Sequence, residues 1–441
     1  MTANLQPSQR RRARSLARRG DAYNRLMNES DVAATGDHRN GPDNPTPPHI
    51  PPAIWALGFV SLLMDVSSEL IHSLLPVFMF TALGASALTI GLIEGAAEAT
   101  ALIVKVFSGV LSDAWGRRKP LAVLGYGLGA LSKPLFAIAQ SSGMVLTARL
   151  IDRIGKGIRG APRDALVADI APPAIRGAAF GLRQSLDTVG AFMGPVLAIM
   201  LMLAWANDFR AVFAVAIIPA VLSVGLLFFG VIEPAVHRTA ARPPLHWSAL
   251  TALGPSCWQV IGIGAIFSLA RFSEAFLVLR AQQGGLSMAF TPLVLIVMNA
   301  VYALAAYPFG KLSDRLSHRG LLMTGLMVLI AADAALALGD APAWLWTGVA
   351  LWGLYMGMTQ GLLAAMIADT APDHLRGTAY GFFNLSSGVA LLAASVLAGW
   401  LWDGFGSAVT FIAGALLSGV TLVVLLALGQ NALPGGRLKN L

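Results

Sequence analysis

The sequence predicts an all-α membrane protein with twelve transmembrane helices in two six-helix halves, and three observations carry this prediction. Only 12% of its 441 residues are Asp, Glu, Lys or Arg, whereas an ordinary soluble domain carries about 25%. The apolar residues come in blocks of about twenty, the length that crosses a bilayer as a helix. Short motifs also recur about 200 residues apart, which indicates an internal duplication. A soluble enzyme, a fibrous protein and, because Cys257 is the only cysteine, a disulfide-stapled secreted domain are excluded.

Residues 1–52 form a basic tail ahead of the first apolar block. Eight arginines between Arg10 and Arg39 are diluted by five acidic residues, and a Pro-rich run from Gly41 to Pro52 follows. Lys and Arg gather on the cytoplasmic side of membrane proteins, where a basic segment gains about 1 kcal/mol per cation near anionic lipid. We therefore expect a disordered cytoplasmic tail. A nucleic-acid-binding arm is the weaker alternative, and a secretory signal is excluded because no apolar core directly follows the arginines.

Twelve apolar segments follow the tail. Their predicted ranges are 53–81, 86–111, 120–140, 143–161, 177–204, 209–231, 256–279, 289–311, 321–339, 344–367, 378–402 and 408–429. We expect an N-terminal half over 53–232, a cytoplasmic linker over 233–255, a C-terminal half over 256–430 and a cytoplasmic tail over 431–441. Each segment is long enough to span the membrane once, so the predicted protein is multi-pass. We expect it to be monomeric.

The loop cations alternate from one connection to the next. The connections of one set carry nearly all of them, namely Arg117, Arg118 and Lys119; Arg163 and Arg176; Arg238 and Arg242; Lys311, Arg315 and Arg319; Arg376; and Arg437 and Lys439 in the tail. Because positive loops stay inside, an even number of segments places both termini in the cytoplasm. The expected location is the cytoplasmic (inner) membrane.

The internal repeat is visible at the residue level. Residues 165–182 read ALVADIAPPAIRGAAFGL, and residues 365–382 read AMIADTAPDHLRGTAYGF. A second repeat relates Gly109-Val-Leu-Ser-Asp113 to Gly310-Lys-Leu-Ser-Asp314. Parallel repeats of this kind belong to transporters that rock two halves about a site near the membrane midplane.

A glycine- and charge-containing motif lies between the second and third segments. It consists of Gly109, Asp113, Gly116, Arg117 and Arg118, and a weaker copy occupies the equivalent loop of the second half. This pattern resembles the loop signature of the major facilitator superfamily. The resemblance implies that the loop is a gate that locks the two halves together on the cytoplasmic side.

Two further motifs carry the same resemblance. In the fourth segment, Arg153-x-x-Lys156-Gly157-x-x-x-Ala161 is similar to the family motif R-x-x-Q-G-x-x-x-A, with Lys156 in place of Gln. In the fifth segment the spacing of Gly181, Gly190, Gly194, Pro195 and Ala198 is similar to the pattern of proton-coupled exporters, with Ala in place of the last Gly. The resemblance covers residues 53–429 and implies antiport. From the residues alone, small side chains at Gly190 and Gly194 indicate close helix packing.

Ionisable side chains inside the segments are the candidate functional residues, because each costs about 2.5–3.5 kcal/mol at the membrane centre. Asp65, Glu69 and His72 share one face of the first segment. Two carboxylates one turn apart repel when both are ionised, which favours keeping a proton on one of them. We expect proton coupling through Asp65 and Glu69, with Glu94 and Glu98 as the next candidates. His72 is either a proton relay or a hydrogen-bonded structural residue.

The fourth and fifth segments supply a second set of candidates, for substrate binding or an internal charge network. Its members are Arg149, Asp152, Arg153, Lys156, Arg183 and Asp187. Arg149, Arg153 and Lys156 form a cationic stripe that suits a carboxylate or phosphate, whereas the second copy of this segment lacks these charges, so the fold does not require them. The structural alternatives are static ion pairs, between Arg183 and Asp187 and among Glu94, Glu98 and Lys105.

The expected function is secondary active transport, with export of an amphiphilic small organic compound in exchange for protons. The alternative is a proton-coupled symporter that imports an organic anion. A membrane sensor or enzyme on the same scaffold is a third possibility, which no nucleotide-binding loop or catalytic constellation supports. The expected partners are a small-molecule substrate, protons and the lipid bilayer. We expect no nucleic acid, cofactor or metal site, and no enzymatic activity.

Overall fold

A computed structural model describes residues 49–115, 117–233, 252–313, 316–339, 341–359, 361–372 and 375–427. Within these ranges the protein is helical, without strands, and nine helices are long and apolar enough to cross a membrane. The all-α prediction is confirmed. Residues 1–48, 234–251 and 428–441, which hold most of the two predicted tails and the linker, lie outside the described residues.

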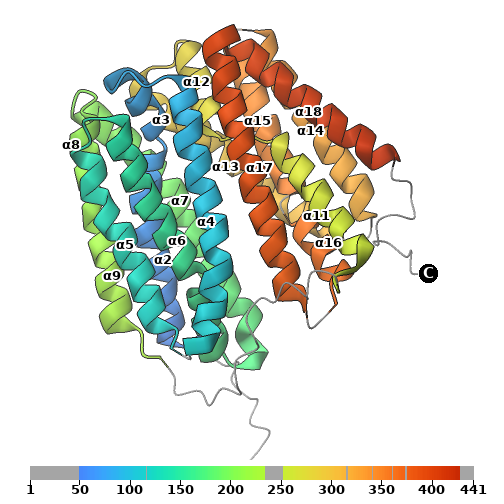
Figure 1. Ribbon diagram of the computed structural model, residues 1–441. Coiled ribbons are helices and arrows are strands. Elements are labelled where there is room, and N and C mark those ends of the chain that lie inside the picture. The colour runs from blue at the N-terminus through green and yellow to red at the C-terminus, as the bar shows by residue number, and fades with distance from the viewer. Residues whose placement is uncertain are drawn as a thin grey trace, which may run out of the picture. The chain divides into compact units, whose positions relative to one another are not determined.

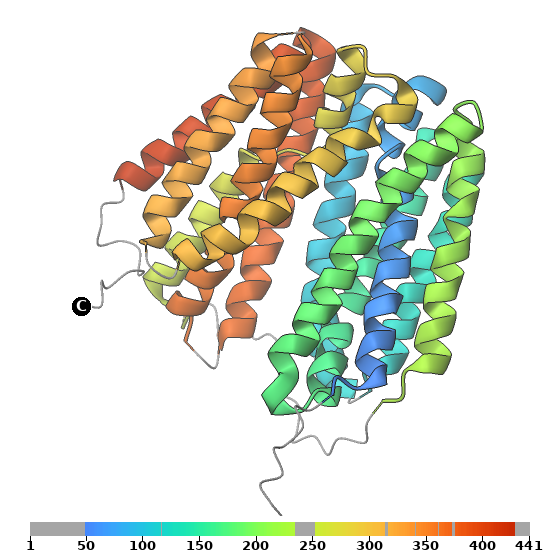
Figure 2. The same cartoon turned by 180° about the vertical axis from the view of Figure 1, so that it is seen from behind.

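The helices of the first half match its six predicted segments (Figures 1 and 2). In chain order they are α2 (Pro52–His72), α3 (Leu75–Val77), η1 (Phe78–Ala82), α4 (Ala87–Trp115), α5 (Lys119–Ala137), α6 (Ser142–Ile170), η2 (Pro173–Ile175), α7 (Arg176–Ala204), α8 (Phe209–Val215) and α9 (Ile217–Gly230). The first segment is thus α2, α3 and η1 in series, and the sixth is α8 followed by α9.

The second half repeats this arrangement. Its helices are α11 (Gly254–Leu269), α12 (Ala275–Gln283), η3 (Met288–Phe290), α13 (Pro292–Ser313), α14 (His318–Leu338), α15 (Pro342–Thr359), α16 (Leu362–Thr370), α17 (Arg376–Phe405) and α18 (Ser407–Ala427). We call the end of the bundle at which α4 begins the cation-poor end, and the end at which α4 reaches Trp115 the cation-rich end.

Three further predicted segments differ in detail from the helices. The fourth was expected to end near residue 161, where the apolar residues end. The helix α6 instead continues to Ile170 through several charged turns. The seventh was expected to be one helix over 256–279, and it is broken between α11 and α12 by the non-helical stretch 271–273. The tenth is likewise divided into α15 and α16. Discontinuous helices are a recurrent source of binding sites in transporters.

Glycines let one helix of each half pack directly against the other. α4 and α17 run side by side (Figure 1). A Cβ atom on Gly91 of α4 would lie 2.1 Å from the carbonyl oxygen of Ser395, and one on Gly399 of α17 would lie 2.4 Å from the carbonyl oxygen of Ala87. The contact between the halves therefore depends on backbone approaching backbone.

At the cation-poor end a carboxylate of the second half caps a helix of the first half. Asp403 of α17 accepts hydrogen bonds from the backbone N–H groups of Ala87 (2.9 Å) and Leu88 (2.8 Å), at the start of α4. First-turn N–H groups have no partner within their own helix, and the positive helix terminus attracts an anion. Asp403 thus ties the two halves together.

Asp403→Ala is expected to lower the free energy of unfolding by about 1 kcal/mol, the usual loss for a helix cap, because two first-turn N–H groups lose their acceptor. The measurement is the thermal unfolding midpoint of the detergent-solubilised protein. Asp208→Ala is the matched control, because Asp208 caps α8 within the first half by accepting from Arg210 and Ala211. Both variants should lose stability, and only Asp403→Ala should also change transport. Unchanged transport in Asp403→Ala would contradict a role for this cap between the halves.

Candidate substrate cavity and buried charge network

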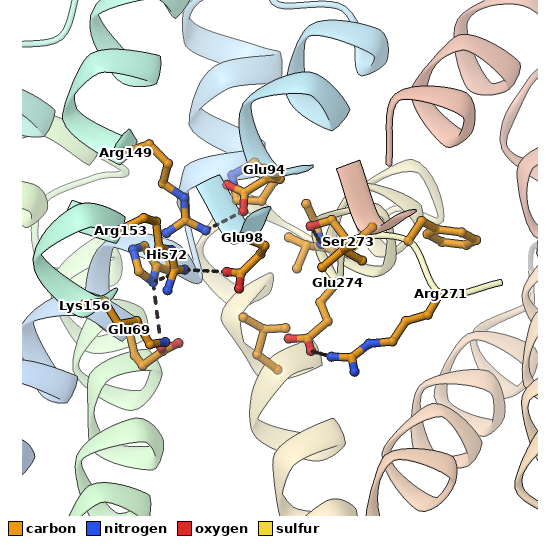
Figure 3. Close-up of a pocket in the computed structure, with 16 residues that line it drawn as sticks. Glu69, His72, Glu94, Glu98, Arg149, Arg153, Lys156, Arg271, Ser273 and Glu274 are labelled. Atoms are coloured by element: carbon orange, nitrogen blue, oxygen red, sulfur yellow. Dashed lines mark hydrogen bonds and ion pairs between the residues drawn. The ribbon is translucent and has the colours of Figure 1, made fainter. Parts of the chain in front are cut away.

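A cavity of about 220 Å³ lies between the two halves (Figure 3). The first half lines it with Glu69, His72, Pro76, Glu94, Glu98, Arg149, Arg153 and Lys156, and the second half with Arg271, Phe272, Ser273, Glu274, Ala275, Val278, Leu295 and Leu391. The wall from the first half is almost entirely ionisable. The wall from the second half combines the break between α11 and α12 with apolar side chains of α12, α13 and α17.

Two ion pairs join α4 and α6 along the polar wall. Arg149 pairs with Glu94, and Arg153 Nη2 lies 2.9 Å from Glu98 Oε1. Both guanidinium groups are buried, and Nε and Nη1 of each have no hydrogen-bond partner among the described residues. Since a guanidinium carries five N–H donors, each arginine can bind a further acceptor while it keeps its carboxylate. The predicted alternative of ion pairs for Glu94 and Glu98 is thus present, although with arginines of α6, whereas Lys105 is exposed.

Lys156 is the third cation of the stripe and lies one turn beyond Arg153. It is exposed, and no carboxylate of the described residues lies within 4 Å of its amino group. Glu98, Glu69 and Asp65 nevertheless act on it electrostatically. The substitution of Lys for the family's usual Gln thus adds an unpaired positive charge to the cavity.

A buried network behind the cavity links three helices. His72 lies between two carboxylates, with Nδ1 3.7 Å from Glu69 Oε1 and Nε2 3.5 Å from Asp152 Oδ2. Lys133 Nζ of α5 contacts Asp152 Oδ1 at 2.8 Å and donates to Ser68 Oγ at 3.0 Å. Asp152 was a candidate for substrate binding or an internal charge network, and its carboxylate contacts Lys133 of α5. Lys133 was not among the predicted site residues, and its only sequence signal is a lysine inside an apolar segment.

Asp65 and Glu69 share one face of α2, as expected, but their side chains have different neighbours. Glu69 lies beside His72, whereas Cβ of Asp65 lies 3.1 Å from the position that a Cβ atom on Gly190 of α7 would take. Asp187 of α7 contacts Arg183, with Nη1 3.4 Å from Oδ2, and Arg163, with Nη1 3.7 Å from Oδ1. The Arg183–Asp187 pair is therefore part of a larger cluster between α6 and α7.

Gly190 and Gly194 bring α7 against α2 at the level of these acids. A Cβ atom on Gly190 would lie 2.5 Å from the carbonyl oxygen of Leu62, and one on Gly194 would lie 2.8 Å from Cβ of Glu69. Pro195 is buried within α7. By contrast, a Cβ atom on Gly181 would meet no atom within 4 Å. Close packing, predicted from small residues alone, therefore occurs at the second and third glycines of the pattern and not at the first.

The predicted gate loop makes its described contacts within the first half. Arg118 Nε lies 3.0 Å from Asp169 Oδ2 of α6, and the Arg118 backbone N–H donates to Glu233 Oε1 at 2.6 Å. Gly109 lies in α4 and faces Ala161 of α6, and Arg117 is exposed. Gly116 and the side chain of Asp113 lie outside the described residues. The gating role therefore stays a prediction.

In the second half, Arg271 and Glu274 form an ion pair across the helix break, with Nη2 and Oε1 3.8 Å apart. The lining thus contains four cations, Arg149, Arg153, Lys156 and Arg271, and four carboxylates, Glu69, Glu94, Glu98 and Glu274. Its charges balance when His72 is neutral. Among the described residues, no group of three or more His, Cys, Asp or Glu side chains is arranged to hold a metal ion.

Comparison with known proteins identifies the family. The family model described as Major Facilitator Superfamily matches residues 57–394. An uncharacterized MFS-type transporter of Methanocaldococcus jannaschii is 32% identical over 380 residues, which cover 85% of this chain and 94% of the relative. The multidrug resistance protein MdtH of Salmonella typhi is 24% identical, over 84% of this chain and 91% of the relative. The inner membrane transport protein YajR of Escherichia coli is also 24% identical, over 84% of this chain and 82% of the relative.

Solved structures agree with the fold. A bacterial homolog to the human lysosomal transporter Spinster matches with a TM-score of 0.71 at 16% identity, over 86% of this chain and 97% of that chain. A D-xylose-proton symporter matches with a TM-score of 0.64 at 16% identity, over 87% of this chain and 97% of that chain. These matches agree with the predicted fold of twelve helices, and the family model confirms the predicted family. The chain belongs to the major facilitator superfamily of secondary transporters.

Proposed function

We propose that the protein is a proton-coupled transporter that exports an amphiphilic small organic compound bound in the central cavity. The observation that carries this proposal is the unequal chemistry of the two cavity walls. The first half contributes ionisable side chains, whereas the second contributes Phe272, Val278, Leu295 and Leu391 beside the Arg271–Glu274 pair. A ligand with a polar group at one end and an apolar body fits such a site.

Two observations favour export as the direction. MdtH, which resembles this chain over most of its length, is named as a multidrug resistance protein. The glycine pattern of α7 resembles that of proton-coupled exporters, and Gly190 and Gly194 make the close contact with α2 that the pattern implies. We place the protein in the cytoplasmic membrane with both termini inside, on the strength of its alternating loop cations.

The second candidate is proton-coupled import of an organic anion. Its supporting observation is the set of free donors at Arg149, Arg153 and Lys156. An anion bound there would place a second negative charge beside Glu98 and would favour protonation of that carboxylate. Anion and proton would then bind cooperatively, which is the requirement for symport, whereas a cationic substrate would compete with the proton.

Transport in oriented membranes separates the two candidates. In everted vesicles with an acidified interior, the exporter is expected to accumulate members of a panel of amphiphilic compounds, and a protonophore should abolish the accumulation. Accumulation of organic anions in intact energised cells would instead support the importer. Transport that persists undiminished after collapse of the proton gradient would overturn proton coupling for both.

Lys156→Gln, which restores the family's usual residue, tests whether the stripe binds substrate. We expect the apparent affinity for an anionic substrate to fall about tenfold, because a hydrogen bond to a charged group contributes about 1.5–3 kcal/mol. The measurement is the concentration dependence of transport in proteoliposomes. Lys105→Gln is the control, since Lys105 is an exposed cation of α4 that does not line the cavity. If Lys156→Gln and Lys105→Gln had the same apparent affinity for the anionic substrate, Lys156 would have only a structural role.

A further inference from the structure

We infer that Asp333 of α14 binds a proton inside the membrane and exchanges it with the substrate cavity past the ring of Phe272. Asp333 belongs to the second half and does not line the cavity. It is therefore separate from the acidic candidates of the first half, Asp65, Glu69, Glu94 and Glu98. Its part in transport rests on the proposed function, whereas the bound proton does not.

Asp333 is a buried carboxyl group without a partner. Its relative exposure is 0%, and both Oδ1 and Oδ2 lack a hydrogen-bond partner among the described residues. The ion pairs of the second half within these residues are Arg271 with Glu274 and His318 with Asp369, and neither includes Asp333. Nothing offsets the desolvation of an ionised carboxylate in such surroundings, so the side chain takes up a proton and becomes neutral.

The internal duplication shows that no structural ion pair explains this acid. Lys133 and Asp152 of the first half lie 2.8 Å apart and are both buried. At the repeat offset of 200 residues they correspond to Asp333 and Trp352. The second half thus keeps an ionisable group at one position and has an aromatic ring where the opposite charge would lie. The carboxyl of Asp333 is left free to bind a proton in place of a cation.

Phe272 lies between Asp333 and the cavity. The position that a Cβ atom on Gly414 of α18 would take is 2.7 Å from Asp333 Oδ2 and 2.9 Å from Phe272 Cε1, so the carboxyl and the ring edge are neighbours. Of the two residues only Phe272 lines the cavity. Phe272 also belongs to the non-helical stretch 271–273 between α11 and α12. Movement of this stretch opens Asp333 to water in the cavity without unwinding a helix.

The aromatic cluster around Phe272 contains two unused hydrogen-bond donors. The ring centroids of Phe272 and Trp352 lie 5.3 Å apart, and those of Trp352 and Tyr355 lie 6.3 Å apart. Trp352 Nε1 and the Tyr355 hydroxyl are buried and have no hydrogen-bond partner among the residues that the structure describes. Native proteins keep few such groups, because each one costs free energy. An ionised Asp333 needs donors of this kind once it has released its proton.

The other ionisable groups near α14 are engaged elsewhere. Of the two helices packed most extensively on α14, α15 contributes Tyr355 and α18 contains no ionisable side chain. The remaining groups of the elements around α14 and Phe272 have other partners, namely Asp369 with His318, Arg280 with the carbonyls of Leu336 and Gly339, Arg319 with that of Leu425, and Arg271 with Glu274. None of these cations is placed to neutralise Asp333, which leaves the proton to do so.

Infrared spectroscopy of the full-length protein in lipid nanodiscs tests the inference without any substrate. The probe is the proton, followed at neutral pH through the carbonyl-stretch band of protonated carboxylic acids. We expect Asp333→Asn to lose the contribution of one carboxyl from this band. Asp208→Asn is the matched control, because Asp208 is exposed and Asn also caps a helix. An unchanged band in Asp333→Asn would show that Asp333 is ionised and would overturn the inference.

Asp333→Val provides a second variant with an apolar side chain of similar volume. Because Asp333 has no hydrogen bond or ion pair to lose, Asp333→Asn and Asp333→Val should unfold at or above the thermal midpoint of the wild type. Asp333→Val should lose the same part of the band. If both variants were clearly less stable than the wild type, Asp333 would have a structural partner, and the inference would be wrong.

Hydrogen–deuterium exchange of the same carboxyl tests the path past Phe272. On transfer to D2O the band shifts as the carboxyl proton is replaced, and Phe272→Leu should speed this shift at least about tenfold, as expected when local opening becomes easier. Phe411→Leu is the control. Phe411 lies in the same cluster, with its ring centroid 5.6 Å from that of Phe272, but does not line the cavity. Exchange as slow in Phe272→Leu as in the wild type would rule out this path.

Transport assays separate this inference from the proposed function. With a substrate found by the panel, Asp333→Asn should retain substrate exchange across proteoliposomes. It should lose at least about tenfold of its gradient-driven accumulation, a factor within the usual range for coupling between two sites. Unchanged accumulation together with a lost band would refute the role of Asp333 in transport. A wild-type protein that shows the band but transports no member of the panel would refute the proposed function instead.

Discussion

Lys133→Met is expected to destabilise the folded protein by about 3–5 kcal/mol, the cost of leaving one member of a buried ion pair without its partner. The Lys133 and Asp152 side chains are 0% and 1% exposed and lie 2.8 Å apart. Without the ammonium group, Asp152 keeps His72 at 3.5 Å as its remaining basic neighbour. The unfolding midpoint of the protein in detergent, compared with that of wild type, measures the loss.

The double variant Lys133→Met with Asp152→Leu identifies the cause. Removing both charges should recover most of the lost stability, since an apolar pair of similar volume often replaces a buried ion pair without cost. Lys105→Met removes an exposed lysine of α4 and should stay within about 0.5 kcal/mol of wild type. A double variant as unstable as the single one would assign the loss to packing rather than to charge.

Gly399→Ala is expected to lower stability by about 1–3 kcal/mol, the usual cost of overpacking, and to reduce the initial rate of transport in proteoliposomes severely. The added Cβ would lie 2.4 Å from the carbonyl oxygen of Ala87 and 2.6 Å from Cα of Leu88. Both are backbone atoms of the opposite half, so the helices must separate. The same two residues donate to Asp403, and the cap would be lost with the contact.

Gly404→Ala is the matched control in the same helix. A Cβ atom at Gly404 would meet no atom within 4 Å, so a new methyl group requires no movement of α4. Stability and transport are expected to match those of wild type. If the two variants were equally impaired, helix propensity or folding would explain the loss, and the contact between the halves would not.

The two halves share a fold but divide the chemistry of the site. Asp152, Arg153 and Lys156 of α6 correspond in the repeat to Trp352, Gly353 and Met356. In the structure, α6 carries the cationic stripe, whereas Trp352 is buried in an aromatic cluster with Phe272 and Tyr355. The duplication therefore explains the architecture, and divergence between α6 and its copy explains why the cationic stripe of the cavity comes from the first half alone.

The charged residues of each helix and their neighbours along the same helix were predictable, whereas their partners on other helices were not. Spacing along one helix places Asp65 and Glu69 on a common face, because helical periodicity is local. The surroundings of Asp65 depend on the register between α2 and α7, which close contact at Gly190 sets, where a Cβ atom would lie 2.5 Å from the carbonyl oxygen of Leu62. Spacing likewise identified Asp152 as a charge of the fourth segment, whereas its partner, Lys133, follows only from the packing of α6 against α5.

The amino-acid sequence by itself determined the membrane location, the helical class, the duplication, the family and the segments that carry charge. These properties follow from hydrophobic length, composition and repeated motifs, which need no knowledge of how distant segments pack. Only the tertiary structure decided that the seventh segment is broken at the cavity, that Lys156 lacks an ion-pair partner among the described residues and that Asp152 pairs with Lys133. The physical reason is that charge pairing depends on ångström-scale distances between helices, and those distances arise from side-chain packing across the whole bundle.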